Sequence, residues 1–175
     1  MSVRVYEGIT LVIIPVEQYF KKNISLISNF SKKGYEIIYV TSNKPFKILN
    51  EVFKKKKIEN VFVIDMITKT AVNAPKKEKN VLFTNSPISL TEVSISINQL
   101  LNKLKNKKRM LFFDSLTALR IYNDESRVEK FTHFLTNKLR FAEVKAIFIS
   151  VEEETDKLLI QRLSLLVDNV VKLND

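Results

Sequence analysis

The sequence predicts an α/β fold, a three-layer sandwich in which a mainly parallel sheet lies between two layers of helices. The first observation is that short, unbroken apolar runs recur along the chain, as is typical of strands covered on both faces. The second is that successive runs are separated by segments whose apolar residues have helical spacing. Helices between successive strands imply right-handed crossovers, and therefore parallel neighbours in the sheet.

The predicted strands follow the apolar runs in chain order. They are residues 9–14, 35–41, 61–64, 110–113, 146–151 and 167–173, with a shorter strand at 81–84. Helices are predicted where apolar residues recur every three or four positions. Their apolar faces run from Phe20 to Phe30, Phe46 to Phe53, Val93 to Leu104, Val128 to Leu139 and Leu158 to Leu166. The polar, basic stretch 67–79 is predicted to be a loop, and residues 1–175 are expected to form a single domain.

Some residues mark expected helix boundaries. Gly34 falls just after the first helix, where a left-handed residue commonly ends a helix. Pro45 suits the first position of the second helix, because its missing N–H would have no partner there. Two capping boxes are expected to open later helices. They are Ser89 with Glu92 and Ser126 with Glu129.

The composition excludes several kinds of chemistry. The chain has no cysteine, which excludes disulfides, thiolate metal sites and cysteine nucleophiles. It has one histidine, His133, which excludes a metal site with several histidine ligands. His133 lies off the apolar face of its predicted helix and is expected to be exposed. No apolar run approaches the roughly 18 to 20 residues that a membrane-spanning helix needs. We therefore expect a cytoplasmic protein with no membrane partner.

The formal net charge is +10, and lysines supply most of it. A basic balance of this size suits nucleic acid, acidic proteins or anionic lipid as a partner, whereas lysines scattered over many segments also suit a solvated surface. The candidate nucleic-acid-binding residues are Lys54, Lys55, Lys56 and Lys57. This run can contact phosphate backbones, or it can be a solvated helix end that complements the helix dipole.

Ligands of open parallel sheets bind beyond the carboxyl ends of the strands. The candidate site is therefore made by residues 15–22, 41–44, 114–115 and 150–154. Asp114 directly follows a predicted strand, a position in which a carboxylate can hold Mg²⁺ or can instead cap a helix or a turn. Glu152 to Glu154 can bind a hard cation, although we expect them to begin the last helix and to complement its dipole.

The segment around Asp114 also carries a family resemblance. Residues 109–125, Arg-Met-Leu-Phe-Phe-Asp-Ser-Leu-Thr-Ala-Leu-Arg-Ile-Tyr-Asn-Asp-Glu, resemble the Walker B segment of KaiC-like members of the RecA superfamily, as found in archaea. The resemblance continues through 131–140 and 146–154, and the order of strands and helices fits over nearly the whole chain. It implies a RecA-like P-loop NTPase core that associates side by side with its neighbours, with the nucleotide site at the seam.

The chain departs from this family where the phosphates would bind. The family's first strand leads into G-x-x-x-x-G-K-[ST], but the only two glycines here, Gly8 and Gly34, lie elsewhere. Residues 41–44 replace the paired glutamates that typically end the family's second strand. The resemblance therefore implies a degenerate, non-hydrolysing member with no catalytic residue, no metal and no cofactor. The alternative is a member that still binds ATP and Mg²⁺. Its vestigial nucleotide site would consist of Lys21, Lys22, Asp114 and Ser115.

Three functions follow from these observations. The first is a non-catalytic RecA/KaiC-like domain, a pseudo-ATPase that acts as a regulatory or assembly module through a protein partner or a second copy at the RecA-type seam. The second is a nucleic-acid-binding accessory protein of the recombinase-like group, which the resemblance and the +10 charge favour. The third is a divergent ATP-binding protein or ATPase whose phosphate cradle is built unconventionally.

Overall fold

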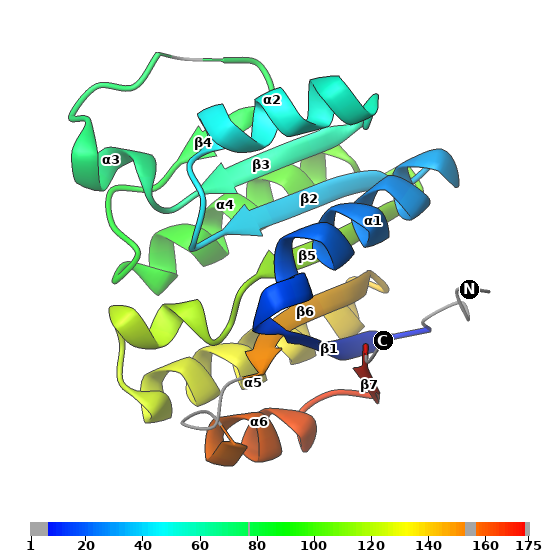
Figure 1. Cartoon of the computed structure of the whole chain (residues 1–175), viewed down its shortest axis with the longest axis vertical. Helices are drawn as coiled ribbons and strands as arrows, with labels where there is room; N and C mark the ends of the chain where they lie inside the picture. Colours follow the sequence, from blue (N-terminus) through cyan, green and yellow to red (C-terminus); the bar gives the residue numbers. More distant parts are fainter. Residues whose placement is uncertain (1–6, 77, 153–156, 174–175) are drawn as a thin grey trace.

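The computed structural model describes residues 7–76, 78–152 and 157–173. Its centre is a seven-stranded sheet in which every pairing is parallel (Figure 1). The strands are β1 (Ile9–Pro15), β2 (Glu36–Thr41), β3 (Val61–Asp65), β4 (Val81–Phe83), β5 (Arg109–Asp114), β6 (Lys145–Glu152) and β7 (Asn169–Lys172). Their order across the sheet is β4-β3-β2-β5-β6-β1-β7.

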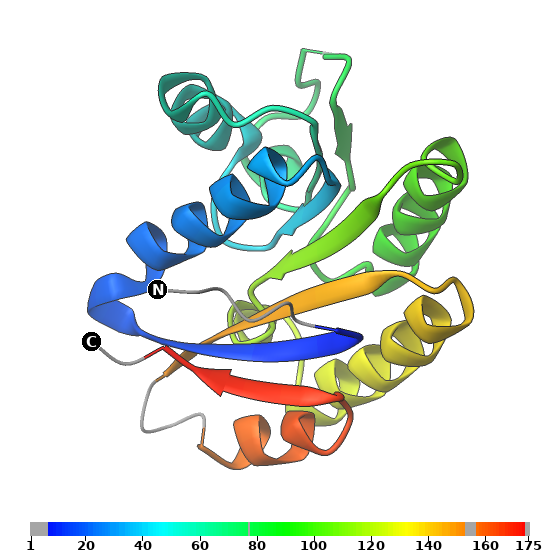
Figure 2. The same cartoon turned by 90° about the vertical axis from the view of Figure 1, so that its right-hand side faces the viewer.

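Helices cover both faces of the sheet, which confirms the predicted fold class (Figures 1 and 2). The helices are α1 (Tyr19–Lys32), α2 (Phe46–Lys56), α3 (Thr68–Ala71), α4 (Leu90–Lys103), α5 (Glu125–Phe141) and α6 (Lys157–Ser164). Two short 3-10 turns, η1 (Val16–Gln18) and η2 (Ala118–Ile121), follow β1 and β5. α1 and α2 pack on one face, and α4, α5 and α6 pack on the other. No helix in the described part of the chain is long and apolar enough to cross a membrane.

Each face of the sheet has its own apolar core. Successive strand residues point to opposite faces, so Phe112 packs edge-on against Phe30 of α1, while Phe113 packs edge-on against Phe131 of α5. All of these ring contacts are buried, and burying one such side chain contributes about 1.5–3 kcal/mol. The strands are therefore unbroken apolar runs because both of their faces are buried, as the sequence predicted.

Some predicted boundaries are wrong by one or a few residues. β2 begins at Glu36, and β7 spans only Asn169–Lys172 of the predicted 167–173. Pro45 is the N-cap of α2, and the helix itself begins at Phe46. The predicted loop 67–79 contains the short helix α3. Gly34 lies after α1 with φ +76°, the left-handed conformation expected there.

Neither predicted capping box forms. Ser89 is the N-cap of α4, but its side chain makes no capping hydrogen bond. Glu92 accepts instead from the backbone N–H and the side-chain amide of Asn85, each at 2.7 Å. α5 begins one residue before Ser126, because Asp124 caps it by accepting from the Arg127 N–H at 2.8 Å. An aspartate two positions earlier therefore takes the capping role that the sequence pattern had given to Ser126.

Candidate functional site

The carboxyl ends of the strands meet at one edge of the sheet, where this fold class binds ligands. Register places them level with one another, since Thr41 of β2 pairs with Asp114 of β5 and with Asp65 of β3. Pro15 of β1 pairs in the same way with Glu152 of β6. The predicted site segments 15–22, 41–44, 114–115 and 150–152 therefore meet at one edge, while residues 153 and 154 lie outside the described part of the chain.

Asp114 is at the centre of this edge, and both of its carboxylate oxygens are engaged. Its side chain is buried, with the residue 1% exposed. The Tyr19 hydroxyl donates to Oδ1, and the Tyr39 hydroxyl donates to Oδ2. Behind these donors, the Asn23 amide donates to the Tyr39 hydroxyl at 2.9 Å, and the Asn43 amide donates to the Tyr19 hydroxyl at 3.4 Å.

Burial sets the protonation of this cluster. Desolvation raises the pKa of Asp114, and the hydrogen bonds from Tyr19 and Tyr39 only partly oppose it. Burial also raises the pKa of both tyrosines, and the neighbouring Asp114 carboxylate raises them further. Both hydroxyls therefore stay protonated and remain hydrogen-bond donors. Lys44 is the nearby cation that favours the ionised form of Asp114.

Ser115 makes hydrogen bonds to Ser42 and to the turn that follows it. The peptide bond between Asp114 and Ser115 is cis. The Ser42 hydroxyl donates to the Ser115 carbonyl at 2.9 Å and accepts from the Ser115 N–H at 3.1 Å. The Ser115 hydroxyl accepts from the Ala118 N–H at 3.1 Å and lies 3.2 Å from the Thr117 hydroxyl. Its side chain thus stabilises the start of η2.

Lys21 and Lys22 do not join Asp114. Both lie on the first turns of α1. The Lys22 ammonium donates to the carbonyl of Leu173, beyond the end of β7, at 3.3 Å. Lys21 is exposed and lines a cavity between α1 and α2. Of the four residues in the predicted nucleotide site, the structure therefore brings together only Asp114 and Ser115.

A cavity of about 250 Å³ adjoins the aspartate cluster. It is lined by Val16, Tyr19, Asn43, Ser115, Thr117, Ala118, Ile121 and Val151. These side chains offer hydroxyl, amide and apolar groups, and none of them is charged. The volume is below the roughly 300–1,000 Å³ of most small-molecule sites. Such a cavity can hydrogen-bond a small neutral group, but its lining supplies neither a cation for phosphate nor a carboxylate for Mg²⁺.

Of the three glutamates expected to begin the last helix, Glu152 has a different position from the one predicted. Glu152 is the last residue of β6 rather than part of a helix, and its side chain forms an ion pair with Lys172 of β7, on the other side of β1. The strand continues because Glu152 still pairs in register with Pro15. Glu153 and Glu154 lie outside the described residues. Among the described residues, no group of three or more histidine, cysteine or acidic side chains is placed to hold a metal ion.

The lysine run and the histidine lie where the sequence predicted. Lys54 to Lys57 are all exposed at the carboxyl end of α2, and Lys57 ends the helix in the left-handed conformation, φ +53°. His133 is exposed on α5, 3.3 Å from the side-chain amide of Asn137.

Sequence reasoning placed Tyr19 in the candidate segment 15–22 but did not predict its contact with Asp114. It missed Tyr39, which lies inside the predicted strand 35–41, and nothing in the spacing of either tyrosine pairs it with Asp114. Asp65 was also missed, although a carboxylate at a strand end was the signal used for Asp114. Its oxygens accept from the N–H groups of Phe46, Ile67 and Thr68 at 2.6–2.8 Å. Asp65 therefore caps α2 and α3 together.

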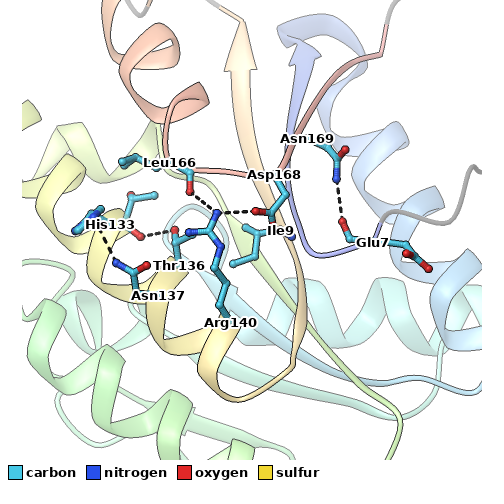
Figure 3. A network of polar contacts seen from close by, with 10 residues as sticks. Glu7, Ile9, His133, Thr136, Asn137, Arg140, Leu166, Asp168 and Asn169 are labelled. Carbon is cyan, nitrogen blue, oxygen red and sulfur yellow. Dashed lines mark hydrogen bonds and ion pairs between the residues drawn. The ribbon is translucent and has the colours of Figure 1, made fainter.

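A second polar network lies at the opposite, amino-terminal edge (Figure 3). Arg140 of α5 donates to Asp168 at 2.6 Å and to the Leu166 carbonyl at 3.2 Å. The other oxygen of Asp168 accepts from the N–H of Ile9, the first residue of β1, at 2.7 Å. Burial alone would raise the pKa of Asp168, but the Ile9 N–H and Arg140 outweigh it and lower that pKa. This network joins α5, β1 and the segment before β7.

Comparison with known structures identifies the fold. A KaiC-like protein from the hyperthermophilic archaeon Pyrococcus horikoshii superposes with a TM-score of 0.64 at 13% identity, over 95% of this chain and 72% of that one. An uncharacterized Pyrococcus horikoshii protein in complex with an unknown peptide gives 0.69 at 11% identity, over 96% and 78%. An ATPase domain gives 0.66 at 10% identity, over 97% and 71%. The chain therefore has the RecA-like fold of KaiC-like ATPase domains.

Within this class, the chain belongs to the family described as "Family of unknown function (DUF7504)", whose model matches residues 51–173. The matched segment runs from α2 to the end of β7 and includes Asp114. It begins after Tyr19 and Tyr39. No curated protein matches the chain.

Proposed function

We propose that this chain is a degenerate, non-hydrolysing RecA/KaiC-like domain that acts as a regulatory or assembly module through a protein partner. The observation that carries the proposal is the engagement of Asp114. In an active P-loop enzyme a carboxylate at this strand end holds Mg²⁺ or its water. Here both oxygens accept from tyrosine hydroxyls, so a magnesium shell at this point would have to displace two buried hydrogen bonds.

The phosphate side of the site supports the same proposal. A P-loop closes around phosphates with backbone N–H groups of glycines. Here β1 ends at Pro15, η1 follows from Val16, and Tyr19 begins α1 with its hydroxyl on Asp114. The residues present therefore do not fit Mg·ATP, and we derive no catalytic step through it.

A protein partner is supported by the fold rather than by a bound group. One structural neighbour was crystallised with an unknown peptide. The resemblance to RecA-type domains also implies side-by-side association. A domain that no longer hydrolyses nucleotide can still act by binding other proteins through its surface. A second copy of this chain, or an active relative, is the corresponding partner at the RecA-type seam.

The test is nucleotide binding and turnover by purified protein. We expect no Mg·ATP-dependent rise in melting temperature and no phosphate release above background. Asp114→Ala is expected to lower thermal stability without changing either nucleotide readout, because no transferring phosphate is stabilised there. Turnover that disappears in Asp114→Ala would overturn the proposal and favour a divergent ATPase.

The second candidate function is nucleic-acid binding, which one observation favours. Lys54 to Lys57 are contiguous, exposed and placed at one helix end. If they bind phosphates, replacing all four with alanine weakens binding to a short duplex. The same change would flatten the slope of log affinity against log salt, because fewer counterions are released. If the four substitutions leave the slope of log affinity against log salt unchanged, Lys54 to Lys57 do not bind nucleic acid.

A further inference from the structure

A second cavity lies between α1 and α2, on the outer side of these helices' packing against the sheet. Its volume is about 510 Å³. It is lined by Phe20, Lys21, Ile24, Ser25, Ser28, Asn29 and Lys32 of α1, and by Val52 and Lys56 of α2. The two helices lie side by side on one face of the sheet (Figures 1 and 2). We call this feature the α1–α2 groove.

The groove has an apolar floor along one face of α1. Its α1 residues recur at helical spacing from Phe20 to Lys32, a span of about 18 Å at 1.5 Å per residue. Ile24 is buried, whereas Phe20 and Val52 are half-buried and form the accessible apolar surface. Ser25, Ser28 and Asn29 add neutral polar groups between the two ends. The length and shape fit about three turns of a partner helix laid along it.

The charge of the groove has one sign. Lys21 and Lys32 lie near its two ends on α1, and Lys56 lies on the α2 wall. All three side chains are exposed, and within the described residues none of them forms an ion pair. No carboxylate lines the groove, although the exposed Glu51 neighbours Val52 on α2. The cations are therefore available to an acidic ligand.

We propose that the α1–α2 groove binds an acidic amphipathic helix of a partner protein, an inference that rests on the proposed function as an interaction module. The partner's apolar residues, spaced i, i+3 or i+4 and i+7, would cover Phe20 and Val52. Its carboxylates would lie against Lys21 and Lys32, which are about 16 Å apart along α1. A nucleic acid is disfavoured because a phosphate backbone gains nothing from the apolar floor, and because only three lysines line the groove, so few counterions would be released.

The experiment uses the full chain and a designed ligand. A fluorescein-labelled helical peptide of about 14 residues carries leucines at i, i+3, i+7 and i+10 with glutamates on both flanks. One matched peptide has lysine in place of every glutamate, and a second has serine in place of every leucine. Anisotropy is measured at low and at physiological salt, and a duplex DNA of about 20 base pairs is titrated in parallel.

The protein variants separate the groove from the general charge. The groove variant is Lys21→Glu/Lys32→Glu/Lys56→Glu, and the control is Lys105→Glu/Lys107→Glu/Lys130→Glu, which makes the same charge change at exposed sites elsewhere. We expect saturable binding of the acidic peptide, at least a tenfold loss in the groove variant and less than a twofold change in the control. The lysine and serine peptides should bind at least tenfold more weakly. Circular dichroism checks that both variants fold.

Each contrary result overturns the inference. The groove is not the site if the acidic peptide fails to saturate below about 1 mM, or if both triple variants lose binding equally. Tighter binding of the duplex, lost in the groove variant but kept in Lys54→Glu/Lys55→Glu/Lys57→Glu, would assign the groove to nucleic acid. The nucleotide assays are run on the same samples. ATP turnover would overturn the proposed function whatever the peptide does, whereas absent docking without turnover overturns only this inference.

Discussion

Two aspartates at opposite edges of the sheet are stabilised in opposite ways. Asp114, at the carboxyl edge, is 1% exposed and accepts from two neutral tyrosine hydroxyls. Asp168, at the amino edge, has a side chain that is 36% exposed and accepts from Arg140 and from the Ile9 N–H (Figure 3). The pKa of Asp114 is raised, chiefly by burial, and that of Asp168 is lowered because its hydrogen bonds and its cation outweigh burial.

The difference shows what a hydroxyl can and cannot do for a buried carboxylate. A tyrosine hydroxyl satisfies a lone pair but brings no charge, so the desolvation of Asp114 still dominates its pKa. A guanidinium brings charge as well as donors, and it does so at Asp168 with modest burial. At the edge where this fold class binds ligands, the carboxylate is thus hydrogen-bonded by neutral groups, whereas at the opposite edge it is held by an ion pair.

The largest expected effect comes from removing one donor at the carboxyl edge. Tyr39→Phe leaves Oδ2 of Asp114 and the Asn23 amide without their partner in a buried place. We expect the free energy of unfolding to fall by about 2–3 kcal/mol, measured by urea denaturation at pH 7. The control is Tyr35→Phe, a buried tyrosine outside this network whose ring packs on Phe30. An equal loss in both variants would contradict the special role given to Tyr39.

Much of the carboxyl edge could be predicted from the sequence, but its closure could not. Continuous apolar runs gave the parallel sheet, and a parallel sheet brings Thr41 and Asp114 to one edge. The position of Tyr19 beside Asp114 depends on where α1 begins after β1. The single 3-10 turn η1 sets that starting point. Tyr19 and Tyr39 lie 95 and 75 positions from Asp114, so no local spacing joins them.

The amino edge was harder to predict from the sequence. Arg140 follows the apolar face of α5 and looks like an ordinary solvated position, and Asp168 was placed inside a predicted strand. Their contact depends on how α6 returns the chain to β7, which is tertiary packing rather than local propensity. Gly8 had no assigned role either, because it precedes the strand rather than following a helix. Only the structure shows that it lies against Asp168.

The next effect tests how tightly the amino edge is packed. Gly8 has φ +73°, and a Cβ added there would meet the Asp168 carboxylate well inside van der Waals contact. Gly34 has a similar φ of +76° but open space around it. We expect Gly8→Ala to cost about 2 kcal/mol and Gly34→Ala about 1 kcal/mol, since the second carries backbone strain alone. Equal unfolding free energies for the two variants would show that the Asp168 side chain can move aside to make room for the added methyl group.

The pH dependence of Asp114→Asn sharpens the comparison from the carboxyl side. A raised pKa means that the protonated carboxyl favours folding, so this contribution is complete below the ordinary value of 3.8 and is lost as pH rises through the folded value. Asparagine does not ionise. Relative to wild type, Asp114→Asn should therefore gain stability as pH rises from 4 to 8, measured by urea unfolding at each pH. A gap that stays constant or moves in the other direction would mean that the hydroxyls outweigh burial.

The smallest effect is expected at Asp168, and its pH dependence has the opposite sign. A lowered pKa stabilises the fold above the ordinary value of 3.8, and that contribution is lost as pH falls through the folded value. Asp168→Asn should cost less than about 1 kcal/mol at pH 7, because the pair with Arg140 is partly exposed. The difference from wild type should shrink below pH 4, and at 1 M salt, where the Debye length is about 3 Å. If Asp168→Asn and Asp114→Asn changed with pH in the same direction, the two edges would share one mechanism, and the contrast between a hydroxyl-bound and a guanidinium-bound carboxylate would fail.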